Sequence, residues 1–149
     1  VLVDGRDVTE QIREPRVSRA VSEIARIPRV RELLVLKQRE MAKRKGVVMD
    51  GRDIGTNVMP DAEVKVFLTA SVKERAARRY AELKAKNESV TLEQLERDIA
   101  LRDRMDEQRE VSPLRKAEDA VLLDTTGMTI PQVVERVLQL TEAFANKES

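Results

Sequence analysis

The sequence contains no cysteine, no histidine and no tryptophan, and it has only one tyrosine and two phenylalanines. Without cysteine the chain can form neither disulfides nor zinc–thiolate sites, and it has no thiol nucleophile. The absence of histidine removes the commonest general base and transition-metal ligand. So few aromatic rings make a stacking surface for single-stranded nucleic acid improbable. The chemistry that remains is that of carboxylates, of lysine and arginine, and of the backbone.

Long hydrophobic runs and an excess of charge of one sign are missing as well. No stretch approaches the roughly eighteen apolar residues of a membrane-spanning helix, and no signal peptide is visible, so we expect a cytoplasmic protein without a membrane partner. The 28 basic side chains nearly balance the 27 acidic ones, which argues against a nucleic-acid-coating protein. A length of 149 residues is typical of one domain. Any cationic site must therefore come from local clustering.

Strand and helix signals alternate along the chain. Three short apolar runs predict buried strands, at residues 47–49, 64–68 and 120–123. Capping signatures after the second and third runs, at 71–74 and 129–132, predict helices that begin there. Further helices are expected at 16–27 and 29–44, on either side of Pro28 and with Gly46 as a C-cap, and at about 91–109. This alternation predicts an α/β fold with a parallel sheet, from which residues 75–110 project as a charged helical hairpin.

The tetrapeptide Asp-Gly-Arg-Asp occurs twice, at residues 4–7 and 50–53. In the first copy the Asp-Gly pair predicts a hairpin turn. The second copy follows the expected strand 47–49, which places Arg52 and Asp53 at the carboxyl end of a parallel strand, where ligands bind in open α/β sheets. A plain turn or a structural ion pair is the alternative for this second copy.

Arginines recur at helical spacing. Arg102, Asp106 and Arg109 share one helix face, Arg75, Arg78 and Arg79 share a face of the preceding helix, and Arg29 and Arg31 follow Pro28. Each group taken singly could be a solvated, salt-bridged helix surface. Guanidiniums, however, suit bidentate binding of phosphate oxygens. Several arginine groups converging on one strand end would form a phosphoryl-binding site.

Three segments together resemble the bacterial cytidylate kinases: VSEIARIPRVRELLVLKQRE, GVVMDGRDIGTNVMPDAEVKVFLTASVKERAARRY and RDRMDEQREVSPLRKAEDAVLLDTT. The resemblance covers essentially the whole chain. It implies a P-loop nucleoside-monophosphate-kinase type of fold, with three layers, a parallel sheet and a helical lid. It also implies transfer of a phosphoryl group from ATP, with Mg²⁺, to CMP or dCMP, and we expect a monomer that binds no nucleic acid and supplies no metal ligand of its own.

The resemblance assigns roles to eight residues. Ser22 and Arg31 match positions that contact CMP, chiefly its base, and Arg52 and Asp53 match residues that hold its phosphate and sugar. Arg102, Asp106 and Arg109 match lid-side residues that close on the phosphates and ribose. Asp50 is expected near the phosphate-transfer centre, whereas the first tetrapeptide has no catalytic counterpart. The candidates for the catalytic group are Asp50, Arg52, Asp53, Arg102 and Arg109.

One departure from the family pattern concerns ATP. The family opens with a glycine-rich G-x-x-x-x-G-K-[ST] loop that cradles the ATP phosphates, whereas none of the five glycines here builds that motif. The first strand and the P-loop are therefore expected to be missing, and the 149-residue chain alone to be inactive. The expected parts are a nucleoside-monophosphate-binding subdomain at 1–46, a core sheet from 47–74 and 111–149, and a helical lid at 75–110.

Two other functions stay open at this stage. The chain could be a non-catalytic CMP-binding fragment or a diverged binding module that keeps only the acceptor pocket. It could also be a helical interaction domain that uses its charged hairpin to bind a protein partner.

Overall fold

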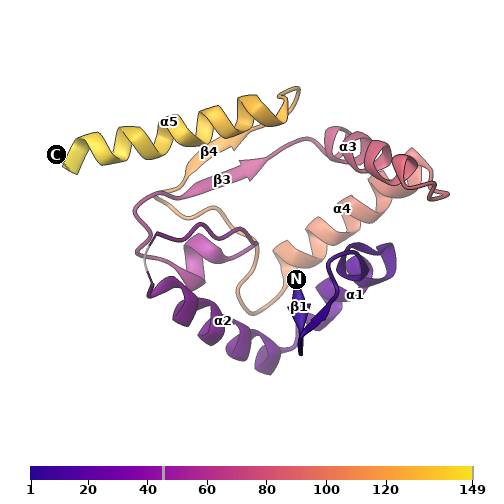
Figure 1. Cartoon of the computed structure of the whole chain (residues 1–149), viewed down its shortest axis with the longest axis horizontal. Helices are drawn as coiled ribbons and strands as arrows, with labels where there is room; N and C mark the ends of the chain where they lie inside the picture. Colours follow the sequence, from indigo (N-terminus) through magenta and orange to yellow (C-terminus); the bar gives the residue numbers. More distant parts are fainter. Residues whose placement is uncertain (45, 149) are drawn as a thin grey trace.

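The computed structural model describes residues 1–44 and 46–148. Figure 1 shows the N-terminal hairpin, α1 and α2 on one side of the molecule, β3, β4 and α5 on the opposite side, and α3 and α4 at a third. The elements in chain order are β1 (Leu2–Val3), β2 (Arg6–Asp7), η1 (Gln11–Arg13), α1 (Pro15–Ile24), α2 (Pro28–Ala42), η2 (Ile54–Val58), β3 (Val66–Thr69), α3 (Val72–Ala85), α4 (Leu92–Gln108), β4 (Val121–Asp124) and α5 (Ile130–Glu148).

The first Asp-Gly-Arg-Asp copy is a hairpin turn, as predicted. Strands β1 and β2 pair antiparallel, with Val3 opposite Arg6. The two residues between them have positive φ angles, 49° at Asp4 and 77° at Gly5. Two consecutive positive φ values are the requirement of a type I′ turn, which aspartate tolerates and glycine adopts without strain.

Most helix boundaries follow their local signals. The backbone N–H of Glu74 donates to the Ser71 hydroxyl at 3.1 Å, and that of Gln94 donates to Thr91 at 3.2 Å. At the start of α5, Thr129 N–H donates to the Gln132 side chain at 2.8 Å. Pro28 occupies the first turn of α2, where its missing N–H costs nothing.

Two helix ends differ from their predictions. Helix α1 ends at Ile24 rather than at residue 27. Helix α2 ends at Ala42, and its C-cap is Lys43 rather than Gly46. Gly46 nevertheless has a φ of 61°, so it supplies the left-handed bend beyond the helix that favours glycine.

Strands β3 and β4 form the predicted parallel pair. Their register runs from Val66 opposite Val121 to Thr69 opposite Asp124. Helices α3 and α4 lie between the two strands in the chain, as a crossover between parallel strands requires.

The prediction of a buried strand at residues 47–49 was wrong. This stretch is irregular, and Val48 is 99% exposed. A strand needs a neighbour to accept its ladder hydrogen bonds, and within the described residues β3 and β4 pair only with each other. Arg52 and Asp53 consequently follow an irregular segment and precede η2, rather than ending a strand.

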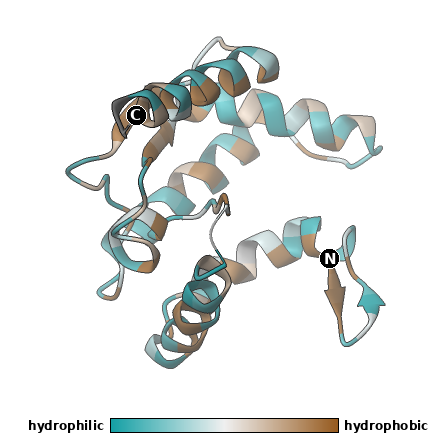
Figure 2. Cartoon of the chain, turned by 60° about the vertical axis from the view of Figure 1, so that its left-hand side comes forward, coloured by the Kyte–Doolittle hydropathy of each residue, from teal (hydrophilic) through white to brown (hydrophobic). Residues whose placement is uncertain are grey.

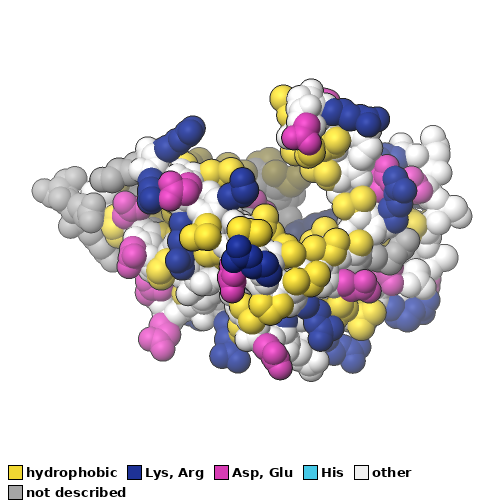
Figure 3. All heavy atoms as spheres, turned by 90° about the horizontal axis from the view of Figure 1, so that it is seen from below, with side chains coloured by type: hydrophobic (Ala, Val, Ile, Leu, Met, Phe, Trp, Pro, Cys, Tyr) yellow, Lys and Arg dark blue, Asp and Glu magenta, His cyan; other side chains and the backbone are white. Residues whose placement is uncertain are grey.

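The expectation that the remaining strands are buried was also wrong. Leu68 on β3 is 57% exposed and Leu122 on β4 is 59% exposed, whereas Leu123 is buried. Exposed hydrophobic side chains are not confined to these strands, because Figure 3, seen from the side of α2 and the N-terminal hairpin, shows others among charges of both signs. Parallel strands are normally covered on both faces, so this pair presents apolar surface that the described residues do not cover.

The main hydrophobic cluster joins α3 to α4. Ala76 and Leu83 of α3 pack with Leu95 of α4, and half-buried Tyr80, Val90 and Ile99 surround them. Figure 2 shows hydrophobic residues recurring along the helices between hydrophilic ones. The predicted helical hairpin is thus a packed pair, because both helices turn apolar residues toward each other.

Candidate functional site

Asp53 is the first centre of a buried network of charged side chains. It is only 6% exposed. Its Oδ2 accepts a hydrogen bond from Arg31 Nη2, which belongs to α2, and its Oδ1 faces Arg109 Nη2 at 3.6 Å. Arg31 and Arg109 are themselves buried. Residues from three separate segments therefore meet at one carboxylate.

Asp106 on α4 is the second centre. It is 3% exposed, and its Oδ2 accepts a hydrogen bond from Arg52 Nε at 3.0 Å. Arg102 Nε lies 3.8 Å from the same oxygen, and Arg109 Nη1 lies 4.0 Å from Oδ1. Because Arg109 contacts both carboxylates, it connects the two centres into one network.

The network has more positive than negative charge. Within the described residues, Arg31, Arg52, Arg102 and Arg109 form ion pairs only with Asp53 and Asp106, which leaves an excess of two positive charges. Asp103 also acts on Arg102 through its charge, but it is paired with Arg75. A phosphate monoester carries about two negative charges at neutral pH. The arrangement can therefore hold such a dianion without leaving net charge buried.

Several donors in this network are not used. Among the described residues, four buried polar side-chain atoms have no hydrogen-bond partner, and all belong to residues predicted to bind the ligand: Ser22 Oγ, Arg31 Nε, Arg102 Nε and Arg109 Nη2. A buried donor without a partner costs free energy, and such groups call for an explanation. An oxyanion is the kind of ligand that would satisfy the three guanidinium donors.

Burial and mutual repulsion both lower the pKa of two arginines in the network. Burial lowers the pKa of Arg102, and the neighbouring Arg52 guanidinium lowers it further. Burial likewise lowers the pKa of Arg109, with Arg31 adding to the effect, while Asp53 and Asp106 oppose it. Like charges held together in this way are relieved when an anion binds between them.

The backbone around η2 positions Asp53. Its carbonyl accepts from Asn57 N at 2.9 Å and from Val58 N at 3.2 Å, so the chain turns tightly after Asp53. Arg39 of α2 donates to the carbonyl of Asn57 at 2.6 Å and to that of Val58 at 3.4 Å. The same helix that carries Arg31 thus also anchors the turn that carries Asp53.

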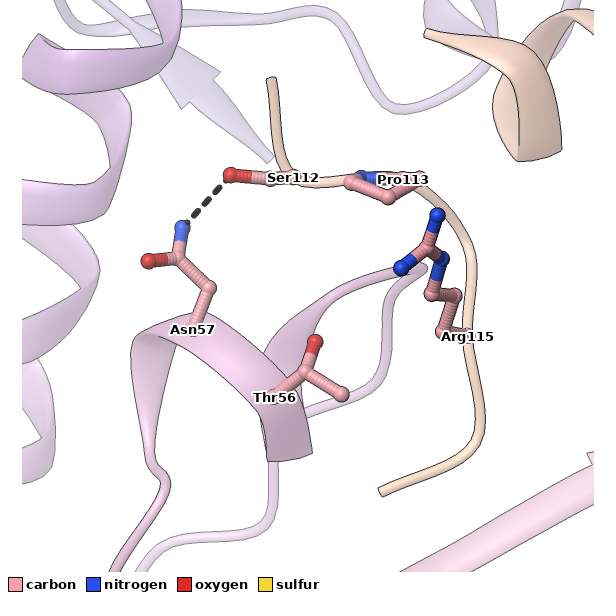
Figure 4. Close-up of a pocket in the computed structure, with 5 residues that line it drawn as sticks. All are labelled: Thr56, Asn57, Ser112, Pro113 and Arg115. Carbon is pink, nitrogen blue, oxygen red and sulfur yellow. Dashed lines mark hydrogen bonds between the residues drawn. The ribbon is translucent and has the colours of Figure 1, made fainter. Parts of the chain in front are cut away.

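A cavity of about 310 Å³ lies beside this turn. Figure 4 shows the five residues that line it, Thr56 and Asn57 from η2 and Ser112, Pro113 and Arg115 from the loop after α4. Asn57 Nδ2 donates to Ser112 Oγ at 2.9 Å and to Asp53 Oδ2 at 3.1 Å. Asn57 is not among the residues predicted from the sequence, although its spacing of four residues from Asp53 is a helical contact distance.

Not every predicted site residue joins the network. Ser22 is buried at 4% exposure, but it makes no hydrogen bond within the described part of the chain. Asp50 is exposed and forms no hydrogen bond or ion pair with any described residue, so the structure offers no contact that supports a catalytic role for it.

The other arginine groups have structural partners instead. Arg75 forms a bidentate pair with Asp103, at 3.0 and 2.6 Å. Arg78 donates to the Thr125 carbonyl at 2.6 Å, and Arg79 donates to Glu82 at 2.7 Å. Arg29 pairs with Glu32 on its own helix. Arg75, Arg78, Arg79 and Arg29 therefore do not converge on the site, because acidic or carbonyl partners bind each of them elsewhere. Of the predicted pair Arg29 and Arg31, only Arg31 reaches the network, through Asp53.

No set of three or more carboxylates gathers into a metal-binding group in the described residues. The side chains at the site are mostly guanidiniums, which repel cations. They do not fit a resident Mg²⁺, and the chain also lacks a glycine-rich triphosphate loop. No helix within residues 1–44 and 46–148 combines the length and the hydrophobicity that crossing a membrane requires.

The fold and the site define an α/β protein with an arginine-rich, largely buried network that carries an excess of positive charge. A family model described as cytidylate kinase matches residues 1–143, and the chain belongs to this family. Similar curated proteins named cytidylate kinase occur in Bacillus velezensis, with 56% identity over 95% of this chain and 63% of the relative, and in Desulfitobacterium hafniense, with 57% identity over 94% and 60%. A third, from Caldicellulosiruptor saccharolyticus, is 55% identical over 94% of this chain and 62% of the relative. The chain thus spans about three fifths of the length of these relatives.

Proposed function

We propose that this chain carries the acceptor site of a cytidylate kinase, a phosphotransferase that moves the γ-phosphoryl group of ATP to CMP or dCMP. The observation that supports this most directly is the excess of two positive charges in the buried network, together with its unused guanidinium donors. The choice of CMP or dCMP as the proposed acceptor nucleotide rests on membership of the cytidylate kinase family.

The proposed roles follow from the contacts. Arg52 and Arg102 approach Asp106 from the more exposed side of the network, each with 39% of its side chain accessible, and would bind the acceptor phosphate as it reacts. Asp53 would hold Arg31 and Arg109 in place and accept from the ribose. Ser22 would contact the base. A guanidinium on the transferring group stabilises the charge that develops in the transition state.

ATP and Mg²⁺ belong to this proposal only as the co-substrate and its metal. The described residues form no metal-binding cluster, and the sequence has no glycine-rich triphosphate loop. The proposed division into an acceptor subdomain (1–46), a core (47–74 and 111–149) and a lid (75–110) places the donor site outside these residues. The exposed apolar surface of β3 and β4 is consistent with a sheet that is incomplete here.

Calorimetry of CMP binding to the 149-residue chain tests the acceptor site. We expect binding that Arg52→Ala weakens by at least tenfold, because a charged hydrogen bond to phosphate is lost. A coupled ADP-release assay with CMP, ATP and Mg²⁺ tests the missing donor site, and we expect no turnover by this chain alone. Turnover within tenfold of a full-length relative would contradict that second expectation, and an unchanged CMP affinity in the Arg52→Ala variant would contradict the first.

The second candidate, a non-catalytic CMP-binding fragment, predicts the same result in both assays for this chain. The two candidates are distinguished by the same ADP-release assay on the full-length protein, in which only a kinase shows turnover. If the protein is a kinase, Arg52→Ala should lower kcat as well as affinity. A raised KM with an unchanged kcat would show that Arg52 only binds.

A further inference from the structure

Asn57 is held more tightly than its place in a turn requires. Its backbone N–H donates to the Asp53 carbonyl at 2.9 Å, and its own carbonyl accepts from Arg39 Nη2 at 2.6 Å. Its side-chain Nδ2 donates to Asp53 Oδ2 at 3.1 Å and to Ser112 Oγ at 2.9 Å. Both hydrogens of the amide are thus directed at polar partners, so the orientation of this side chain is determined.

The Asn57 amide restricts the rotation of the Asp53 carboxylate, which the arginines around Asp53 do not. The terminal torsion of an aspartate is broad, and guanidiniums on long side chains can follow the carboxylate as it rotates. Asn57 reaches Asp53 Oδ2 over a short side chain from a fixed backbone, and it brings no charge. It can therefore fix the plane of the carboxylate without adding repulsion among Arg31 and Arg109 or competing for an anionic ligand.

Ser112 extends the contact to the other side of the site. It lies in the loop that follows α4 and has a φ of 52°. Its hydroxyl accepts from Asn57, and its carbonyl accepts from Arg109 Nε at 2.5 Å. Arg109 in turn faces Asp53 Oδ1 at 3.6 Å. The contacts close a ring through Asp53, Asn57, Ser112 and Arg109, and Figure 4 shows the link between Asn57 and Ser112.

We propose that Asn57 is a positioning residue of the acceptor site. Together with Ser112, it holds the Asp53 carboxylate and the Arg109 guanidinium at the spacing and orientation that a phosphate-bearing ligand requires. It does so without touching the ligand itself. This inference rests on the proposed function, and the experiments below separate the failure of one from the failure of the other.

Calorimetric titration of the 149-residue chain with CMP is the first experiment. Asn57→Leu keeps the approximate volume and removes both donors, and we expect CMP to bind about tenfold more weakly. Ser112→Ala should weaken binding less, and the double variant should bind like Asn57→Leu alone, because both changes open the same ring. Thr56→Val is the matched control, since Thr56 lines the same cavity but its hydroxyl makes only a 3.5 Å contact with the Asp53 carbonyl. It should bind CMP like the wild type.

Asn57→Asp separates positioning from a loss of folding. The Asp53 carboxylate raises the pKa of the new carboxyl at position 57, while the Arg31 and Arg109 guanidiniums that face Asp53 oppose this rise. The new group therefore repels Asp53 at pH 8 and becomes a hydrogen-bond donor once it is protonated. We expect CMP affinity, compared with the wild type at each pH, to recover on lowering the pH to about 5.5. Asn57→Leu should show no recovery. A merely structural role would leave the relative affinity of Asn57→Asp independent of pH, and that result would overturn the proposal.

The remaining outcomes are also decisive. If Asn57→Leu binds CMP as tightly as the wild type, the positioning role is overturned while the proposed function stands. If the wild type does not bind CMP, the proposed function fails. Nuclear magnetic resonance of the Asn57 side-chain amide then tests whether the ring of contacts through Asp53, Asn57, Ser112 and Arg109 exists in solution. Amide hydrogens that are protected from exchange in the wild type and unprotected in Ser112→Ala support it, whereas fast exchange in the wild type overturns it.

Discussion

At the scale of single residues, Ser22 is the site candidate whose burial is least explained by its neighbours. Its hydroxyl is buried and has no hydrogen-bond partner among the described residues. Burying a hydroxyl in this state costs about 1–3 kcal/mol, and alanine would avoid that cost. A role in recognising the base would account for serine at this position.

Ser22→Ala should consequently affect binding and stability in opposite directions. We expect the melting temperature to stay the same or rise, and the preference for CMP over UMP to fall by about one to two orders of magnitude. Thermal unfolding of the chain and titration of the full-length protein with both nucleotides measure these effects. Equal losses for CMP and UMP would remove Ser22 from base recognition, and a clear loss of stability would give it a structural role.

Asp106 offers a second test at this scale, because three guanidiniums depend on it. Asp106→Asn keeps the shape but leaves Arg52, Arg102 and Arg109 without this carboxylate. We expect the free energy of unfolding to fall by about 3 kcal/mol. Sulfate should restore more stability to this variant than to the wild type, because it can replace the lost negative charge.

Urea unfolding with sodium sulfate, and with sodium chloride at equal ionic strength, measures this difference. Glu107→Gln is the control, since Glu107 is an exposed neighbour on the same helix with no ion pair to any described residue. The same sulfate response in both variants would show that the effect is general salt stabilisation rather than occupation of the site.

At the scale of elements, the α3–α4 pair is joined by a contact that lies outside the network around Asp53 and Asp106. Arg75 of α3 and Asp103 of α4 form a bidentate pair next to the hydrophobic cluster. The hydrogen bonds that Arg75 donates to the Asp103 carboxylate raise the pKa of Arg75, although burial opposes this rise. The pair is partly accessible, with 34% and 21% of the two side chains exposed, so its contribution should be moderate.

A double-mutant cycle of Arg75→Ala and Asp103→Ala should give a coupling energy of about 1 kcal/mol in urea unfolding. CMP affinity should change little in all three variants, because neither residue forms a hydrogen bond or ion pair with the described residues of the network around Asp53 and Asp106. Asp103 acts on Arg102 only through its charge. A tenfold loss of CMP affinity without a loss of stability would place Arg75 in the binding site after all.

At the scale of the whole molecule, exposed carboxylates determine how the fold responds to acid. Hydrogen bonds from the side chain and backbone of Thr126 lower the pKa of Asp124, and those of Thr9 lower the pKa of Asp7. A hydrogen bond from Lys65 lowers the pKa of Asp119. Since each carboxyl binds its proton less readily in the folded state, folding is favoured above the ordinary value of 3.8. That contribution is lost as the pH falls through the lowered values.

We therefore expect the free energy of unfolding to decrease as the pH falls below about 4, with a shallower decrease in the Asp124→Asn variant. Urea unfolding between pH 6 and pH 3 measures both slopes. A wild-type stability that stays constant over this range would show that these hydrogen bonds do not persist in solution.

The sequence by itself determined the features that depend on neighbouring residues. The Asp4-Gly5 turn, the caps at Ser71, Thr91 and Thr129, and the break at Pro28 follow from backbone preferences and hydrogen bonds that span two to four residues. The parallel pairing of β3 and β4 was also predicted from the two apolar runs at residues 64–68 and 120–123, because alternation with helices leaves few other arrangements. The family resemblance named six residues that the structure brings together, Arg31, Arg52, Asp53, Arg102, Asp106 and Arg109. It also named Ser22 and Asp50, which make no hydrogen bond to this network within the described residues.

Only the tertiary structure decided which charged residues meet and which strand forms. Arg31 and Asp53 are 22 residues apart, and Arg52 and Asp106 are 54 apart, so no local pattern separates these pairs from Arg75 and Arg78, which have other partners. Residues 47–49 have the composition of a strand, but a strand also needs a neighbour to pair with, and the described chain supplies none. Asn57 and Ser112 carry no charge that would mark them in the sequence, and their importance follows from the ring of contacts that folding closes around Asp53.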